Sequence, residues 1–149
     1  MIKKIENNKK LYLDLLLIGD EQESMIDRYL SRGEMFALFD NDILKTICIV
    51  TDEGNSVCEL KNIATYPKFQ GQGCAKKLIK FIFEYYKNNY NTILVGTGEA
   101  PSIINFYKNC GFTESHRIQN FFIDNYDHLI FENGKQLVDM IYFSKKLNN

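Results

Sequence analysis

The stretch YPKFQGQGCAKKL, residues 66–78, places two glycines and a proline directly before a run of strong helix formers. The chain has only nine glycines and two prolines, so this concentration marks a point where the backbone must stay free of side chains. Strand-forming residues precede the stretch. The pattern therefore predicts a strand, a tight loop and a helix, which requires a fold that mixes helices and strands.

Such a loop can bind an anion. The first amides of a helix lack partners within the helix, and the helix dipole adds partial positive charge there. Glycine lets an anion approach these amides without meeting a Cβ atom. Lysines surround the same point, at positions 68, 76, 77 and 80. We therefore predict a phosphate or pyrophosphate site at this loop.

Two common phosphate-binding loops do not match the sequence. A Walker loop requires lysine after its last glycine, and Cys74 follows Gly73. The dinucleotide fingerprint requires a third glycine where Lys76 stands, and it lies at the first strand–helix junction of its domain. A glycine-rich turn that merely starts a helix is the simple alternative.

Composition limits the class of protein. A length of 149 residues predicts one domain, residues 1–149. The net charge of −1 argues against nucleic acid or an anionic membrane as a partner. Asp14 interrupts the apolar N-terminal segment, which is too short to span a bilayer, so we expect an amphipathic helix in a cytoplasmic protein. The chain has four cysteines, Cys48, Cys58, Cys74 and Cys110, and they form no Cys-x-x-Cys pair. This predicts reduced thiols, with no disulfide and no bound metal.

Hydrophobic periodicity predicts the order of the remaining elements. Two helices are expected near residues 9–18 and 21–31, and a third near 74–88. A short helix, PSIINFYKNC, should end at Gly111. The expected strands are MFALF, ILKTICIV, SVCELKNIAT, TILVGT, FTESHRIQNFFI and QLVDMIYFSKKL. This order predicts an α/β (α+β) domain with a mixed sheet.

Two motifs in this order suggest a family. The loop matches Gln/Arg-x-x-Gly-x-Gly/Ala through Gln70, Gly73 and Ala75, and a later helix matches Tyr-x-x-x-Gly-Phe through Tyr107, Gly111 and Phe112. From about residue 34 to 112 the chain resembles the GNAT superfamily of acetyl-CoA-dependent N-acetyltransferases. The resemblance implies a mostly antiparallel central sheet flanked by helices, with acetyl-CoA and an amine as substrates. Acetyltransferases of this type often form homodimers, and the sequence leaves the oligomeric state open.

The resemblance also implies how acetyl-CoA is bound. Backbone amides of the loop would hold its pyrophosphate, and the strand before the loop would pair with its pantetheine arm. The implied cofactor-binding residues are Ile63, Ala64, Thr65, Gln70, Gly71, Gln72, Gly73, Cys74, Ala75 and Lys76. Many relatives carry an asparagine seven residues before the tyrosine of the second motif, where this chain has Ala100. Its role would pass to Glu99, Ser102 or Asn105.

Acetyl transfer to an amine needs a base, an oxyanion donor and an acid for the leaving thiolate. Glu59 is the candidate base: strand alternation places it on the side of Lys61 and Ile63. Histone-acetylating members of the superfamily carry a catalytic glutamate at the corresponding distance before the motif glutamine. The alternative is a solvated strand carboxylate paired with a lysine. A backbone N–H near Ile63 or Ala64, where relatives carry a strand bulge, would hold the oxyanion.

Tyr107 is the candidate acid, because a phenol with a pKa near 10 is protonated at neutral pH. It also belongs to an apolar helical stripe, so a plain core tyrosine is the alternative. His116 and His128 invite a cysteine–histidine acyl-enzyme scheme, as in arylamine acetyltransferases. The chain lacks the cysteine context of those enzymes, and we expect His116 on a strand and His128 in a loop.

In this family the first helices and the region between the last two strands form the acceptor groove. Here they supply carboxylates and aromatic rings: Asp20, Glu21, Glu23, Asp124, Asp127, Glu132, Phe121, Phe122 and Tyr126. Such a groove would suit a small cationic amine, although a solvated acidic loop would have the same sequence. We expect an N-acetyltransferase for a small molecule or a peptide. A catalytically degenerate acyl-CoA-binding regulatory domain and a structural domain with an incidental anion site are the alternatives.

Overall fold

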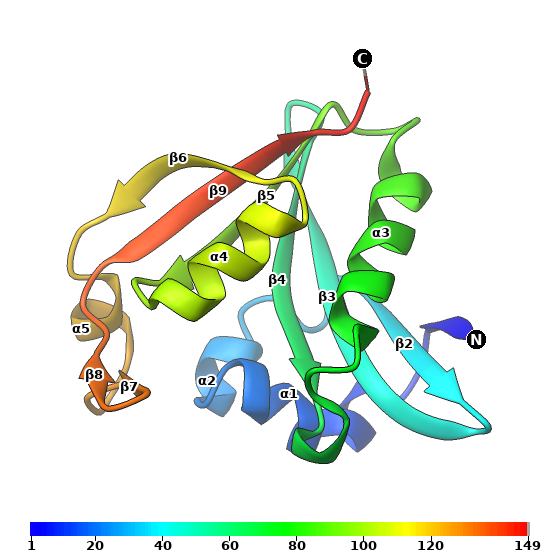
Figure 1. Cartoon of the computed structure of the whole chain (residues 1–149), viewed down its shortest axis with the longest axis horizontal. Coiled ribbons are helices and arrows are strands. Elements are labelled where there is room, and N and C mark those ends of the chain that lie inside the picture. The colour runs from blue at the N-terminus through cyan, green and yellow to red at the C-terminus, as the bar shows by residue number, and fades with distance from the viewer. Residues whose placement is uncertain (149) are drawn as a thin grey trace.

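The computed structural model describes residues 1–148, which form one large sheet with helices on both faces (Figure 1). The strand order is β1-β2-β3-β4-β5-β9-β6. Within the described residues, β4 and β5 form the one parallel pair of this sheet. The strands are β1 Ile2–Ile5, β2 Glu34–Asp40, β3 Ile43–Gly54, β4 Val57–Thr65, β5 Thr92–Gly98, β6 Thr113–Ile118 and β9 Met140–Lys146; β7 Phe131–Glu132 and β8 Lys135–Gln136 form a separate hairpin. The predicted fold class is confirmed.

The helices divide between the two faces of the sheet. The short helices α1 (Leu13–Gly19) and α2 (Glu23–Ile26) cover one face, and α3 (Cys74–Tyr86) and α4 (Pro101–Asn109) cover the other. The apolar stripe of α3 is buried, as its periodicity predicts. Short 3-10 turns, η1 (Lys9–Tyr12) and η2 (Pro67–Phe69), precede α1 and the glycine-rich loop, and α5 (Phe121–Asn125) lies between β6 and β7.

Some predicted elements differ from the structure. The first residues form β1 and not a helix: they pair with β2, and Ile2 and Ile5, three positions apart, pack on opposite faces of the sheet. The second expected helix shortens to α2. The strand expected over residues 112–123 ends at Ile118, after which Asn120 takes a left-handed conformation and starts α5. Phe122 on α5 then packs into a small separate cluster.

Only residues Val57–Leu60 of β4 pair with β5, and their partners are Thr92–Val95. Beyond these residues β4 continues along β3 to its end, while β5 continues along β9. The two strands therefore separate in the middle of the sheet, which is visible in Figure 1. This gap positions the site described below.

A β-bulge lies where the strands begin to separate. Ile49 of β3 faces Asn62, and the next residue, Val50, faces Leu60, so Lys61 is an extra residue without a partner on β3. A bulge was expected near Ile63 or Ala64, and it lies at Lys61, two positions before Ile63. The extra residue also shifts the alternation, and Ile63 packs on the α3 side with Leu60 and not on the side of Glu59.

The end of α1 packs closely on β4 at Gly19. A Cβ atom there would lie 2.1 Å from Oδ1 of Asn62 and 2.9 Å from the carbonyl oxygen of Ile63. Any side chain at this position would push α1 away from the strand.

We predict that Gly19→Ala lowers the free energy of unfolding by about 1–3 kcal/mol, the usual range for overpacking. Urea denaturation followed by circular dichroism measures the change. The exposed Ser24 offers a control, since Ser24→Ala should change stability by no more than about 0.5 kcal/mol. Equal stability of the two variants would show that α1 does not depend on this contact.

Candidate functional site

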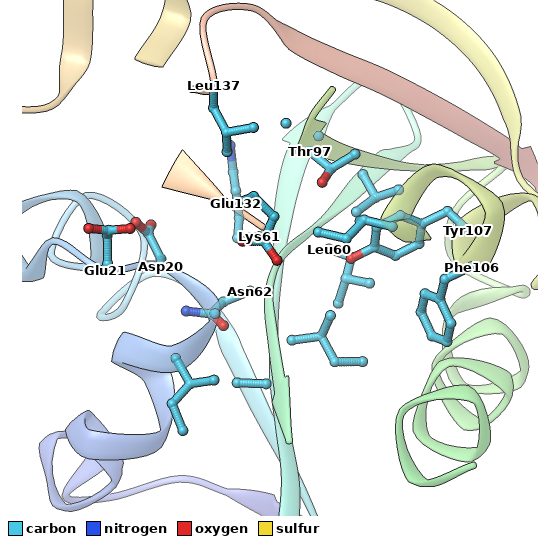
Figure 2. Close-up of a pocket in the computed structure, with 18 of the residues that line it drawn as sticks. Asp20, Glu21, Leu60, Lys61, Asn62, Thr97, Phe106, Tyr107, Glu132 and Leu137 are labelled. Atoms are coloured by element: carbon cyan, nitrogen blue, oxygen red, sulfur yellow. The ribbon is translucent and has the colours of Figure 1, made fainter. Parts of the chain in front are cut away.

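A cavity of about 490 Å³ occupies the gap between the separated strands (Figure 2). Its walls come from the α1–α2 turn, the free part of β4, the end of β5, α4 and the segment from α5 to β9. The cavity thus extends from the glycine-rich loop, which contributes Gln70 and Ala75, to the α1–α2 turn, which contributes Asp20 and Glu21.

The glycine-rich loop has the geometry of an anion site. Gly71 and Gly73 have φ angles of 76° and 82°, which L-residues with side chains rarely adopt. Gly73 directly precedes α3, whose first amides have no acceptor within the helix. The side-chain amide of Gln70 donates a hydrogen bond of 3.0 Å to the carbonyl of Thr65, which ties the loop to the end of β4. The nearby lysines 68, 76, 77 and 80 are exposed.

The expected cofactor-binding residues divide into two groups. Five of them line the cavity: Ile63, Ala64, Thr65, Gln70 and Ala75. The others lie in the loop or the first turn of α3, outside the cavity wall: Gly71, Gln72, Gly73, Cys74 and Lys76. Residues 62–65 of β4 pair with β3, and residues 61–65 leave their other edge without a strand partner in the described chain. An extended ligand could add to this edge as a further strand would.

Glu59 lies behind the cavity wall. Its side chain is buried, accepts a hydrogen bond of 3.1 Å from the Tyr142 hydroxyl, and pairs with Lys61 at 3.1 Å. The ring of Tyr142 reaches Glu59 across Gly96, where a Cβ atom would lie 3.0 Å from the ring. Lys61, and not Glu59, lines the cavity. Glu59 is therefore neither solvated nor directly exposed to a ligand.

Tyr107 lies on α4 with its ring in the core and also lines the cavity. The ring makes edge contacts with Phe106 and Phe112, with centroids 5.3 and 5.8 Å apart. Figure 2 shows its hydroxyl end directed toward β4. Within residues 1–148 the hydroxyl has no hydrogen-bond partner, and burial raises the pKa of the phenol above its ordinary value. Tyr107 thus combines a core ring with a protonated hydroxyl that can donate.

Part of the acidic and aromatic set lines the far end of the cavity. The residues on the wall are Asp20, Glu21, Glu132, Phe122 and Tyr126. The others lie elsewhere. Glu23 pairs with Lys10 at 2.6 Å, Asp127 contacts His128 at 2.6 Å, Asp124 is exposed, and Phe121 packs against Phe122.

Asp20 belongs to a hydrogen-bond network that the sequence did not reveal. Its two carboxylate oxygens accept hydrogen bonds from the hydroxyls of Tyr29, at 2.9 Å, and Tyr126, at 2.7 Å. The side-chain amide of Asn62 donates to the Tyr29 oxygen at 3.1 Å and to the Leu16 carbonyl at 3.0 Å. Burial raises the pKa of Asp20, although both hydroxyls act against this. Asn62, a polar residue within the largely apolar strand β4, was the one sequence signal that such a network exists.

The α1–α2 turn is fastened to the loop after α5. Asp20 contacts Tyr126, the side-chain oxygen of Gln22 accepts from the Asp127 amide at 2.9 Å, and Glu21 contacts His128 at 2.8 Å. We call these contacts the turn–loop clasp. It closes one side of the cavity at its acidic end. The other histidine, His116, lies on β6 and stacks on Tyr142.

The structure also bears on metal binding, on a membrane span and on the cysteines. Residues 1–148 contain no cluster of three or more histidine, cysteine or carboxylate side chains that could hold a metal ion. No helix in this part of the chain is long and apolar enough to cross a membrane. The four cysteines are free thiols, and Cys48 and Cys58 are buried.

Comparison with known proteins identifies the family. The model of the acetyltransferase (GNAT) domain matches residues 31–114, more than half of the chain. The chain belongs to the GNAT acetyltransferase family. This acetyltransferase is 36% identical to the uncharacterized N-acetyltransferase YvbK of Bacillus subtilis over 138 residues, which cover 91% of this chain and 88% of the relative.

Solved structures of the family agree with the fold of this acetyltransferase. A GNAT acetyltransferase from Elizabethkingia anophelis with acetyl-CoA bound has a TM-score of 0.93 and 32% identity, covering 98% of this chain and 97% of that one. An acetyltransferase from Bacillus subtilis in complex with CoA has a TM-score of 0.90 and 31% identity, covering 97% of both chains. The predicted family is therefore confirmed.

We predict that His128 titrates above its ordinary pKa, because hydrogen bonds to Asp127 and Glu21 raise the pKa of its imidazole. The clasp contact with Glu21 should then be strongest when His128 is charged. Its stabilising effect should be complete below the pKa of the unfolded chain and disappear as the pH rises through the higher pKa of the folded one.

Nuclear magnetic resonance of the histidine rings measures the midpoint directly. Glu21→Gln should lower the midpoint of His128. Glu23→Gln is the matched control, since Glu23 pairs with Lys10 and not with His128. A midpoint that is the same in wild type and Glu21→Gln would contradict the assigned contact.

Proposed function

We propose that this acetyltransferase moves the acetyl group of acetyl-CoA to a primary amine of a small molecule or peptide, by direct attack in a ternary complex. The cavity carries this proposal, because it joins the anion-binding loop at one end to the carboxylates at the other. Both substrates can therefore meet at the gap between β4 and β5. In this proposal residues 1–149 act as one N-acetyltransferase domain in the cytoplasm.

The loop and the free edge of β4 would bind acetyl-CoA. The amides between Gln70 and Lys76, with the helix dipole of α3 behind them, offer donors and partial positive charge to the pyrophosphate. Residues 63–65 have one edge without a strand partner, and the backbone groups on this edge can bond to the amides of the pantetheine arm. The relatives from Elizabethkingia anophelis and Bacillus subtilis, whose crystals contain acetyl-CoA and CoA, support this assignment.

The residues around the gap can supply each proton transfer. Glu59 takes the proton of the incoming ammonium through Lys61 or a water beside it, which frees the nitrogen lone pair to form the C–N bond. A backbone N–H at the bulge of Lys61 donates to the oxyanion. As the C–S bond breaks, Tyr107 gives its proton to the thiolate sulfur.

One observation favours a second candidate function. Glu59 is held by both Lys61 and Tyr142 and does not reach the cavity wall. A carboxylate held in this way would not take a proton from an amine in the cavity. The chain would then bind acyl-CoA without turnover, as a regulatory domain does.

A broad panel of primary amines, assayed with acetyl-CoA for release of free thiol, separates the two candidates. Release that depends on one class of amine supports the enzyme. Tight acetyl-CoA binding, measured by calorimetry, without release for any amine would support the regulatory domain.

We predict that Glu59→Gln lowers kcat about a hundredfold at neutral pH, within the usual range for loss of a general base, while acetyl-CoA affinity changes little. The pH–rate profile should also lose the limb that reports the base. Glu84→Gln is the matched control, because Glu84 lies on the outer side of α3 beside Lys87. An unchanged profile in Glu59→Gln would remove Glu59 as the base.

We predict that Tyr107→Phe slows the departure of the thiolate about tenfold or more, because the phenol no longer supplies a proton. Its ring still fills the same space, so the melting temperature should stay close to that of the wild type. Phe106→Leu is a packing control, because it changes the ring that contacts Tyr107 and leaves the phenol in place. Normal turnover in Tyr107→Phe would assign Tyr107 to the core alone.

A further inference from the structure

Asp20 is a carboxylate on the cavity wall whose side-chain partners are all uncharged. Two tyrosine hydroxyls donate to it, and none of the ion pairs within residues 1–148 includes it. A carboxylate withdrawn from water is costly unless a positive charge compensates it. Asp20 is only partly buried, and no positively charged side chain of residues 1–148 is paired with it at this end of the cavity.

The surrounding hydrogen bonds fix Asp20 as an acceptor. Asn62 donates to the Leu16 carbonyl, which can only accept, so the orientation of its amide is determined. The same amide nitrogen donates to the oxygen of Tyr29, and the Tyr29 hydroxyl is then directed to Asp20. The Tyr126 hydroxyl donates to the other carboxylate oxygen of Asp20. Each oxygen keeps a further lone pair for a ligand.

A second observation on the same wall points to a missing donor. Asn62 is only 4% exposed and lines the cavity, and its Oδ1 is buried without a partner in the described part of the chain. This oxygen lies beside Gly19, the residue before Asp20. Acceptors thus outnumber donors on this wall. The partial negative charge of Oδ1 adds to the charge of the Asp20 carboxylate, and a positively charged group bound at Asp20 would offset both.

Asp20 lies well away from the place where the chemistry would occur. Figure 2 shows Asp20 and Glu21 on the opposite side of the cavity from Tyr107 and Phe106. The amine that attacks the thioester must lie at the gap between β4 and β5. A cation bound to Asp20 would therefore be a different group of the acceptor.

We propose that Asp20 binds a positively charged group of the acceptor that is separate from the amine being acetylated. The acceptor would then be a diamine or a larger molecule with two cationic groups, and Asn62 and Tyr29 would be positioning residues for Asp20. This inference rests on the proposed N-acetyltransferase function and names the substrate class of that site.

The first test uses the wild-type protein and two acceptors of equal chain length. Pentanediamine carries an amine at each end, whereas aminopentanol has a hydroxyl in place of one amine. Thiol release at saturating acetyl-CoA should give a kcat/KM for the diamine that is higher by about tenfold or more. Equal values for the two acceptors would overturn the proposal, without any variant having to fold.

The second test removes the charge of Asp20. Asp20→Asn should bring the ratio of the two kcat/KM values close to one and leave acetyl-CoA affinity unchanged. Asp124→Asn is the matched control, since Asp124 is exposed and does not line the cavity. A ratio that survives in Asp20→Asn would overturn the proposal.

The positioning role has its own readout. Tyr29→Phe should raise KM for pentanediamine severalfold, with kcat nearly unchanged and the values for aminopentanol unaffected. A purely structural defect would instead change both acceptors together, and that result would overturn the positioning role.

Equilibrium binding separates this inference from the proposed function. Calorimetry measures pentanediamine binding to the complex with CoA, in wild type and Asp20→Asn. Binding that depends on Asp20 supports the cationic site even where no amine is acetylated, in which case only the proposed function fails. Acetylation of both acceptors at the same rate leaves the function standing and overturns the site.

Discussion

Beyond Leu60 and Val95, β4 and β5 no longer hydrogen-bond to each other, because each strand follows its other neighbour. A sheet normally avoids such an interruption, since it leaves backbone donors and acceptors of two inner edges without partners. Here the separation creates the cavity, exposes an extended edge at residues 61–65 and directs β4 into the glycine-rich loop. The bulge at Lys61 lies where the separation begins, and bulges bend the strand that contains them.

The two ends of the cavity have opposite electrostatic character, although the chain as a whole is nearly neutral. At the loop, backbone amides and exposed lysines favour an anion. At the α1–α2 turn, Asp20 and Glu21 favour a cation. Because these fields are local, one cavity can favour an anionic group at one end and a cationic group at the other without the two competing for the same side chains.

Elements with a strong local cause were predictable from the sequence. Gly73 can precede α3 because glycine adopts the left-handed backbone found there without strain, and the spacing of Leu78, Ile79 and Ile82 buries one face of that helix. β1 was missed because its two isoleucines serve opposite faces of the sheet, so they show no alternation. α5 was missed because its aromatic residues also favour a strand.

The candidate site was only partly predictable, for a different reason. The motif residues Gln70 and Tyr107 could be found because short patterns mark them. The shift of Ile63 to the α3 side depends on one unpaired residue, Lys61, and strand periodicity alone cannot show an insertion. The network of Asp20, Tyr29 and Asn62 joins distant segments, and no local pattern reports such contacts.

The turn–loop clasp has a consequence for the order in which the molecule can assemble. The parts that build the glycine-rich loop lie between residues 43 and 86, so β3, β4 and α3 can come together from one continuous segment. Tyr126 and Asp20, by contrast, are 106 positions apart in the chain. Contacts that close such long loops form late, because the entropy of the intervening chain must be lost first. During synthesis on the ribosome, the half that contains the glycine-rich loop would therefore be complete while the opposite half still waits for the C-terminal strands.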